Sequence, residues 1–373
     1  MRIAPPEFHA ARVERLRDRL RAESLDSLIV TAKPNIAYLT GFFGLAGLLV
    51  VTPEGLRLVV DGRYAEAARL RERELDAINI VILPQGTTYE ESLVDEIDRV
   101  GGGRVGFESA HVTVAAHLDL ARRLREMGLQ PELVPTDSFV EQLRARKDAW
   151  ELATLRDAGS RLSEVAKCII QKPLSGLVEN DFAALIDQQL RQVGFAKPAF
   201  DTIVASGPNS AMPHYRAGDR RMGLGDLVVL DFGGVLNGYC VDMTRTVAIG
   251  AADPRQRRVL EQVSEAQTAA FKAIAPGEAP ETIDERAREV LVRRGLGEAF
   301  SHGAGHGLGL EIHERPRVGP RRVGQPQETL EAGMVFTLEP GAYFPGWGGV
   351  RIEDDVLVTT TGAEWLTHES RTA

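Results

Sequence analysis

Hydrophobic and polar residues alternate along positions 1–140 in a pattern that predicts helices and strands in turn. Val13, Leu16 and Leu20 recur at helical spacing in a charged stretch, and residues 27–31 then form an apolar run typical of a buried strand. Further patterns predict strands near 47–51, 56–60, 78–83, 104–107 and 133, and helices over 64–74, 90–100 and 114–127. This alternation predicts an α/β domain over residues 1–140.

The pattern changes after residue 140. Residues 139–167 form a charged helical stretch in which Trp150, Leu155 and Leu162 share one face, so it can connect the two halves and cover the second core. Farther along, the sequence predicts helices over 179–193 and 254–274, and strands over 227–231, 245–249 and 334–338. Residues 141–373 are therefore predicted to form an α+β domain.

Composition and charge limit the classes of function. The formal charge of −9 argues against binding to nucleic acid or an anionic membrane, which requires clustered Lys and Arg. The N-terminus lacks a basic region followed by an apolar stretch, and the run from Gly41 is too short to span a bilayer. Cys168 and Cys240 lie far apart without CxxC spacing. We therefore expect a cytoplasmic protein without a membrane span.

Two aspartates stand in the segment GDLVVLDFGGVLNGYCVDMTRT. Asp231 ends an apolar run, and Asp242 follows eleven residues later. If both lie at strand ends of an antiparallel hairpin, their carboxylates can face each other at about 5 Å and bind a metal pair. The alternative is that both are ordinary turn residues beside the glycines of this segment.

Histidines cluster in the segment FSHGAGHGLGLEIHERP. His302, His306 and His313 fall within twelve positions, although the chain has only eight histidines. The interspersed glycines allow the backbone to pass close to a ligand. Neutral imidazole binds metals, and a second imidazole can transfer protons near pH 7. The alternative is a solvated loop, or core histidines with hydrogen-bond partners.

Glu339 and Glu353 interrupt hydrophobic sequence in MVFTLEPGAYFPGWGGVRIEDDVLV. Glu339 follows one apolar strand, and Glu353 is expected inside a second one. Burial of an unpaired carboxylate is costly, so these acids are expected to be paired, hydrogen-bonded or metal-bound. For Glu353 the alternative is a structural ion pair with Arg351 on the same strand face.

Taken together, four carboxylates and one imidazole form an oxygen-rich set suited to two divalent cations. Such a set favours Mn²⁺, while Co²⁺, Zn²⁺ or iron can substitute. Paired cations activate water and polarise a carbonyl, as amide hydrolysis requires. One further histidine, His214 in SGPNSAMPHYRAG, is predicted in a loop, where it is either a surface residue or a functional one.

These motifs, with YLTGFFGLAG and DGRY in the first half, resemble the pita-bread metallopeptidases, which include aminopeptidase P, prolidase, methionine aminopeptidase and the metal-free creatinase. The resemblance implies an α/β creatinase-type N-terminal domain, residues 1–140, followed by an α+β pita-bread catalytic domain, residues 141–373. It further implies an Xaa-Pro aminopeptidase, which hydrolyses peptides with proline at the second position by a hydroxide that two metal ions activate.

The resemblance also implies a metal-binding role for each member of the donor set. Asp231 would bind the first metal, and Asp242 and Glu353 would bridge both metals. His306 and Glu339 would bind the second metal, and Glu339 would also accept and donate the proton.

Four further roles follow from the same resemblance. His214 and His313 would stabilise the tetrahedral intermediate and transfer protons. His302 would line the proline subsite, and Arg351 would orient the metal-site carboxylates. That subsite should be hydrophobic and should require no N–H donor from the substrate, because the imide nitrogen of proline carries none.

Several alternatives stay open. A prolidase, restricted to dipeptides, would share the same metal motif. A metal-using lyase or amidinohydrolase is a further alternative, because a fold does not dictate the substrate. A non-catalytic binding protein can also have this fold, although the intact donor set argues against it. The resemblance also implies a homodimer or higher homo-oligomer, in which residues 38–47 and 61–64 are hypothesised to border the active site of a neighbouring subunit.

Overall fold

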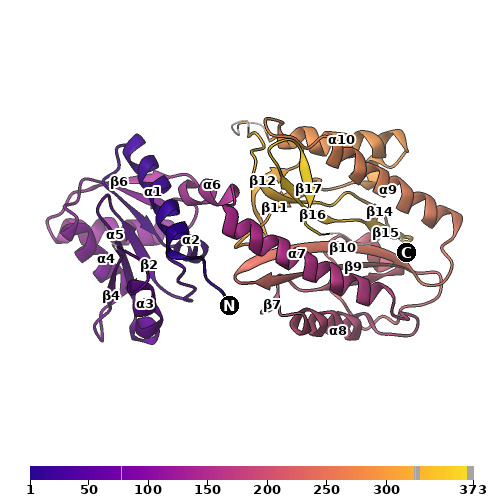
Figure 1. Cartoon of the computed structure of the whole chain (residues 1–373), viewed down its shortest axis with the longest axis horizontal. Helices are drawn as coiled ribbons and strands as arrows, with labels where there is room; N and C mark the ends of the chain where they lie inside the picture. The colour runs from indigo at the N-terminus through magenta and orange to yellow at the C-terminus, as the bar shows by residue number, and fades with distance from the viewer. Residues whose placement is uncertain (77, 323, 325–327, 368–373) are drawn as a thin grey trace. The chain divides into compact units, whose positions relative to one another are not determined.

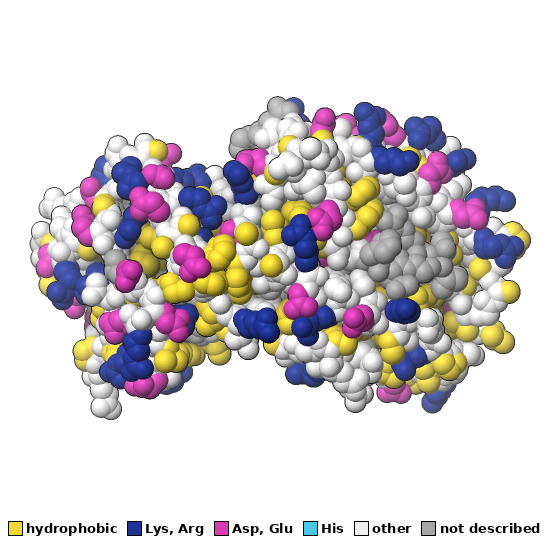
Figure 2. Space-filling model, in the orientation of Figure 1, with side chains coloured by type: hydrophobic (Ala, Val, Ile, Leu, Met, Phe, Trp, Pro, Cys, Tyr) yellow, Lys and Arg dark blue, Asp and Glu magenta, His cyan; other side chains and the backbone are white. Residues whose placement is uncertain are grey.

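Helices and strands alternate through the first part of the chain, as the sequence predicts. The computed structural model describes residues 1–76, 78–322, 324 and 328–367, and separates the chain into two units, Arg2–Arg144 and Ala145–Ala373. In the described residues, no helix combines the length and apolar character needed to cross a bilayer. Basic and acidic side chains lie interspersed over the face shown in Figure 2.

The first unit is built on a mixed six-stranded sheet with the order β4-β3-β2-β1-β5-β6 (Figure 1). Apolar side chains of β1, β2 and β3 pack against Val94 and Ile97 of α4 and Leu120 and Leu124 of α5. The elements are α1 Pro6–Ala22, β1 Ser27–Val30, α2 Lys33–Thr40, β2 Leu48–Val51, β3 Leu56–Val60, η1 Gly62–Tyr64, α3 Ala65–Glu72, β4 Ile78–Ile82, α4 Tyr89–Arg99, β5 Arg104–Glu108, α5 Val114–Glu126, β6 Glu132–Thr136 and α6 Phe139–Ala145.

The second unit combines helices with largely antiparallel sheets, which confirms the α+β prediction. Its sheets have the orders β10-β9-β7, with β8 also paired to β9, β12-β11-β13-β16-β17, and β14-β15. Helix α7 packs along β9 and β10, whereas α9 and α10 lie side by side (Figure 1).

Its helices are α7 Ala149–Ile170, α8 Glu179–Gln192, η2 Gly207–Ala211, α9 Pro254–Lys272, α10 Pro280–Arg293 and η3 Gly297–Ala299. Its strands are β7 Lys197–Pro198, β8 Ile203–Ser206, β9 Leu227–Leu236, β10 Tyr239–Ala248, β11 Gly305–Gly307, β12 Glu314–Val318, β13 Val335–Leu338, β14 Gly341–Phe344, β15 Gly348–Arg351, β16 Asp354–Val358 and β17 Ala363–Trp365. The helices and strands of this unit pack together through two apolar clusters. The strands in these clusters carry the candidate site.

Several element boundaries differ from the prediction. The continuous helical stretch over 139–167 is wrong, because it breaks between α6 and α7, where Asp148 caps α7 by accepting the N–H of Glu151. Two helices, α2 and α10, were not predicted. Helix α2 has only eight residues, which is too short for a periodic signal. It ends at Thr40, and Gly41 with φ of 67° follows as its C-cap. Helix α10 has 14 residues and begins at Pro280, which is a helix-start signal that the prediction did not use.

Candidate metal and peptide site

The β9–β10 hairpin carries Asp231 and Asp242 in the middle of its two strands. Its register pairs Asp231 with Thr244 and Asp242 with Gly233, so the aspartates are diagonal neighbours on one face. The prediction of directly opposed acids at strand ends is wrong, because both strands continue as buried strands beyond the acids. Both aspartates are nevertheless buried side by side, with exposed fractions of 8% and 4%.

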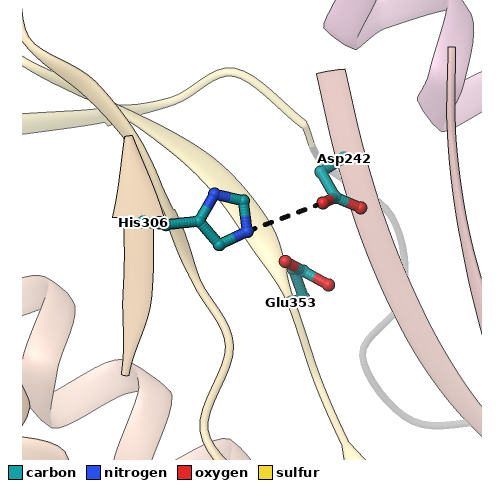
Figure 3. Close-up of side chains that lie close together, drawn as sticks. All are labelled: Asp242, His306 and Glu353. Atoms are coloured by element: carbon teal, nitrogen blue, oxygen red, sulfur yellow. Dashed lines mark ion pairs between the residues drawn. The ribbon is translucent and has the colours of Figure 1, made fainter. Parts of the chain in front are cut away.

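Three further donors approach this hairpin from the other sheet. His306 lies on β11, Glu339 directly follows β13, and Glu353 lies between β15 and β16. Glu353 was predicted inside a strand, but it forms an isolated bridge with Thr244, which aligns it with β10. The donor atoms of Asp242, His306 and Glu353 all lie within 4.8 Å of one another, and Figure 3 shows them converging.

The imidazole of His306 faces the acids with the nitrogen that a metal would use. Its Nε2 lies 3.9 Å from Oδ2 of Asp242 and 3.7 Å from Oε1 of Glu339. Its Nδ1 lies 3.1 Å from the carbonyl oxygen of Gly307, so a proton on Nδ1 leaves the Nε2 lone pair directed at the acids. Burial lowers the pKa of His306 and favours this neutral form.

The buried carboxylates have oxygen atoms that are available to bind divalent cations. Among the described residues, no hydrogen-bond partner reaches the buried Oδ1 atoms of Asp231 and Asp242. Buried carboxylate oxygens without partners are costly unless a cation or a proton compensates them. With one neutral imidazole, this oxygen-rich donor set fits Mn²⁺ and related divalent ions.

Arg351 orders the acids from one side. Its guanidinium forms an ion pair with Asp231 and donates from Nε to Oγ1 of Thr244 at 3.2 Å. Thr244 in turn donates a short hydrogen bond to Glu353. The alternative of an ion pair between Arg351 and Glu353 is not what the structure shows. Arg351 pairs with Asp231 instead and is linked to Glu353 through Thr244. Thr244 was not predicted, although its position two residues after Asp242 on a strand places both side chains on one face.

A cavity of about 380 Å³ opens next to these acids. Its wall contains every predicted catalytic and substrate-binding residue, and also two charged residues that were not predicted, Glu314 and Arg317. The charged and imidazole side chains of the wall are His214, His302, His306, His313, Glu314, Arg317, Glu339 and Arg351. The rings of His306 and His313 lie 4.3 Å apart between centroids. Asp231, Asp242 and Glu353 are buried and absent from this lining.

The hydroxyl of Tyr343, which was also not predicted, holds one side of the cavity. His302 Nε2 lies 2.9 Å from the hydroxyl of Tyr343, and Arg351 Nη1 donates to the same oxygen at 3.0 Å. No local signal singles out Tyr343, because its position depends on the β14–β15 register, which pairs it with Gly349.

The acids at the base of the cavity repel one another. Burial, followed by the charges of Glu353 and Asp231, raises the pKa of Asp242. Burial, followed by the charges of Glu339 and Asp231, raises the pKa of Glu353, and burial also raises the pKa of Glu339. These groups cannot all be ionised in a dry site unless cations lie between them.

This repulsion predicts how the stability of metal-free protein depends on pH. In the folded state the pKa values of Asp242 and Glu353 are raised above the values near 4 that apply when unfolded. The folded protein therefore holds protons that the unfolded chain releases. Their stabilising effect is present below about pH 4 and is lost as the pH rises through the folded pKa values. Thermal denaturation of chelator-treated protein from pH 5 to 8 measures this loss.

The control is the double variant Asp242→Asn/Glu353→Gln, which lacks both titrating groups but keeps the histidines. Relative to this control, metal-free wild type should lose stability as the pH rises. Added Mn²⁺ should reverse the trend in wild type alone, because metals bind ionised carboxylates. If metal-free wild type instead gains stability relative to the control as the pH rises from 5 to 8, the pKa values of Asp242 and Glu353 are not raised in the folded protein.

Comparison with known proteins gives the same architecture. Residues 153–360 match the family model for metallopeptidase family M24, and residues 12–146 match that for the Creatinase/Prolidase N-terminal domain. An Xaa-Pro dipeptidase of Pyrococcus horikoshii is 33% identical over 362 residues, covering 96% of this chain and 97% of that protein.

Solved structures agree over nearly the full length. An Xaa-Pro dipeptidase from Bacillus anthracis has a TM-score of 0.89 at 31% identity, covering 97% of this chain and 98% of that one. An X-Pro aminopeptidase from Thermotoga maritima has a TM-score of 0.86 at 30% identity, covering 96% and 98%. Both compared structures therefore extend over both units of the chain.

Proposed function

This chain belongs to metallopeptidase family M24, and we propose that it is an Xaa-Pro aminopeptidase, which removes the N-terminal residue from peptides with proline at the second position. Family membership makes it a metal-dependent hydrolase, with a creatinase-type N-terminal domain followed by a pita-bread catalytic domain. The observation that carries the proposal is the meeting of four histidines, Glu339 and Arg351 on one cavity beside the buried acids.

Two divalent cations, with Mn²⁺ favoured, would complete the site. The residues that would hold them are Asp231, Asp242, His306, Glu339 and Glu353. Bound there, the cations would polarise the scissile carbonyl and acidify a water molecule. Support comes from the oxygen-rich donor set and from the aspartate oxygens that lack partners among the described residues.

Around the cations, the chain's own residues would manage protons and orientation. Glu339 lies on the cavity wall, where its carboxylate would accept a proton and return it to the leaving nitrogen. His313 and His214 would donate hydrogen bonds to the oxygen on which charge develops. His302, fixed by Tyr343, would form the wall beside the proline ring.

The test compares hydrolysis of Ala-Pro, Ala-Pro-Ala and Ala-Ala-Ala by metal-stripped protein with and without Mn²⁺. Metal-dependent cleavage of Ala-Pro-Ala and no cleavage of Ala-Ala-Ala would support the aminopeptidase. Cleavage of Ala-Pro alone would favour the dipeptidase. If neither proline peptide is cleaved with Mn²⁺ or Co²⁺ bound, the peptidase proposal fails and a lyase, an amidinohydrolase or a binding protein becomes the better candidate.

A dipeptidase is the second candidate function, and Arg317 is the observation that favours it. Arg317 lines the cavity with an exposed side chain on β12. Its guanidinium could bind the free carboxylate of a dipeptide, which a longer peptide does not offer at that position.

The variant Arg317→Gln therefore distinguishes the dipeptidase from the aminopeptidase. For a dipeptidase, kcat/KM for Ala-Pro should fall by about 10- to 100-fold, the equivalent of one charge-assisted hydrogen bond. The value for Ala-Pro-Ala should change little. The matched control is Arg315→Gln, two residues earlier on the same strand, because Arg315 pairs with Glu328 and is absent from the cavity wall. Equal small effects of both variants on Ala-Pro would argue against the dipeptidase.

A further inference from the structure

The segment that carries His214 is fastened at both ends to the start of helix α8. We call residues 206–222, between β8 and β9, the His214 loop. Near its far end, Glu179 N–H donates to the carbonyl of Arg220 at 3.0 Å, and Asn180 N–H donates to that of Gly218 at 3.1 Å. Two residues earlier in the chain, Leu177 accepts the N–H of Met222 at 2.9 Å. The far end of the loop is therefore hydrogen-bonded to the backbone at the start of α8.

The side chain of Glu179 ties together the remaining parts of this loop. It is fully buried, with an exposed fraction of 0%. Its Oε1 accepts from the N–H and hydroxyl of Ser206 at 2.8 and 2.6 Å, at the near end of the loop. Both carboxylate oxygens contact Nδ2 of Asn209, at 3.1 and 3.2 Å, and Oε2 accepts the hydroxyl of Tyr215 at 2.9 Å. A single buried carboxylate thus holds the near end and the middle of the loop.

Tyr215 transmits this anchoring to its neighbour His214. Its ring packs against a small apolar cluster of Ile203, Ala205 and Val229, while its hydroxyl reaches Glu179. The ring and the hydroxyl are therefore held from two directions. His214 itself is exposed, and its imidazole lies on the cavity wall.

The other side of the loop is held by strand β15. Arg351 Nη1 donates to the carbonyl of Pro213 at 3.2 Å, directly before His214. The N–H of Gly349 donates to the hydroxyl of Ser210 at 2.8 Å. An exposed histidine in a loop of Gly, Ala and Pro would otherwise sample many orientations, whereas catalysis requires its donor to be placed in advance.

We infer that Glu179 is a positioning residue, which acts through Tyr215 to hold His214 over the cavity. The inference rests on the proposed function, since it takes His214 as a group that contacts the substrate. Glu179 lies outside the cavity wall and outside the metal-donor group. Its effect should therefore appear in turnover and leave metal binding unchanged.

The test uses the full-length, Mn²⁺-loaded protein and two conservative variants. Glu179→Gln removes the charge and keeps the size, whereas Tyr215→Phe removes only the hydroxyl. Each should lower kcat/KM for Ala-Pro-Ala on the order of 10-fold. Mn²⁺ affinity, measured by titration calorimetry, should stay within about twofold of wild type, since no metal donor is touched. Hydrogen exchange of residues 207–218 should become faster.

A double-mutant cycle separates positioning from general stability. In a His214→Ala background, Glu179→Gln should cause no further loss of kcat/KM, because residues that act through one another are not additive. The matched control is Glu108→Gln in the first unit. Glu108 is also a buried carboxylate, and it accepts the N–H groups of Thr31 and Ala32 at 2.7 and 2.8 Å. This control should lower thermal stability and leave kcat/KM unchanged.

The same fold-loss in the His214→Ala background as in wild type would overturn the inference. Unchanged hydrogen exchange of residues 207–218 in Glu179→Gln would also overturn it. If Glu179→Gln does not fold, Tyr215→Phe decides by the same two criteria. If wild type cleaves no proline peptide, the proposed function fails on its own, and the exchange measurement still decides whether Glu179 anchors the loop.

Discussion

Asp242→Asn should remove both metal binding and peptidase activity, with kcat/KM for Ala-Pro-Ala falling by at least about 10³-fold. Asp242 is buried within the donor group and its Oδ2 faces His306. Asparagine keeps the shape of the side chain but has no negative charge to bind a cation. Mn²⁺ titration calorimetry and peptide hydrolysis measure the two losses independently.

The same variant also tests the stability of the metal-free protein. Because the pKa of Asp242 is raised by burial and by neighbouring acids, a neutral amide should leave metal-free protein as stable as wild type, or more stable, at pH 8. The control Asp157→Asn changes an aspartate that pairs with Arg161 on the surface of α7, and it should change neither property. Full activity of Asp242→Asn would refute the assignment of the metal site.

Arg351→Met should destabilise the second unit by about 3 to 5 kcal/mol, the usual cost of removing one partner from a buried ion pair. Arg351 is 4% exposed and pairs with Asp231. It also donates to Thr244 and Tyr343. Methionine fills a similar volume but leaves the carboxylate without its partner. Denaturant unfolding followed by tryptophan fluorescence reports this change, because Trp150, Trp347 and Trp365 all lie in the second unit.

A second substitution should distinguish the lost charge partner from lost packing. In Arg351→Met/Asp231→Asn no charge is left unpaired at this contact, so the double variant should recover most of the lost stability. Activity should stay low, since a proposed metal donor is missing. Both proteins are compared without metal, so that ligand binding does not contribute. An Arg351→Met protein as stable as wild type would show that the ion pair contributes little.

Local pattern was sufficient for most of the fold. Period-two and period-3.6 patterns located most helices and most strands, because each element buries one face or stripe. They missed α2, which is too short for a periodic signal, and they also missed α10. They also failed at Asp231, where a carboxylate was taken as the end of a strand that continues to Leu236.

The candidate site, like the fold, was predicted from the sequence only in part. The sequence by itself singled out the side chains of the proposed donor set, because a carboxylate inside apolar sequence needs a compensating partner, and because glycines and histidines cluster around one segment. The cavity then contains the histidines that the pattern singled out.

Only the tertiary structure decided how these side chains pair. The diagonal register of Asp231 and Asp242, and the pairing of Arg351 with Asp231, depend on contacts between distant segments. Thr244 and Glu353, for example, meet across 109 positions of the chain. The anchoring of the His214 loop by Glu179 is equally non-local. Local sequence carries periodicity and residue chemistry, whereas register between separate strands is set by how whole sheets and helices pack.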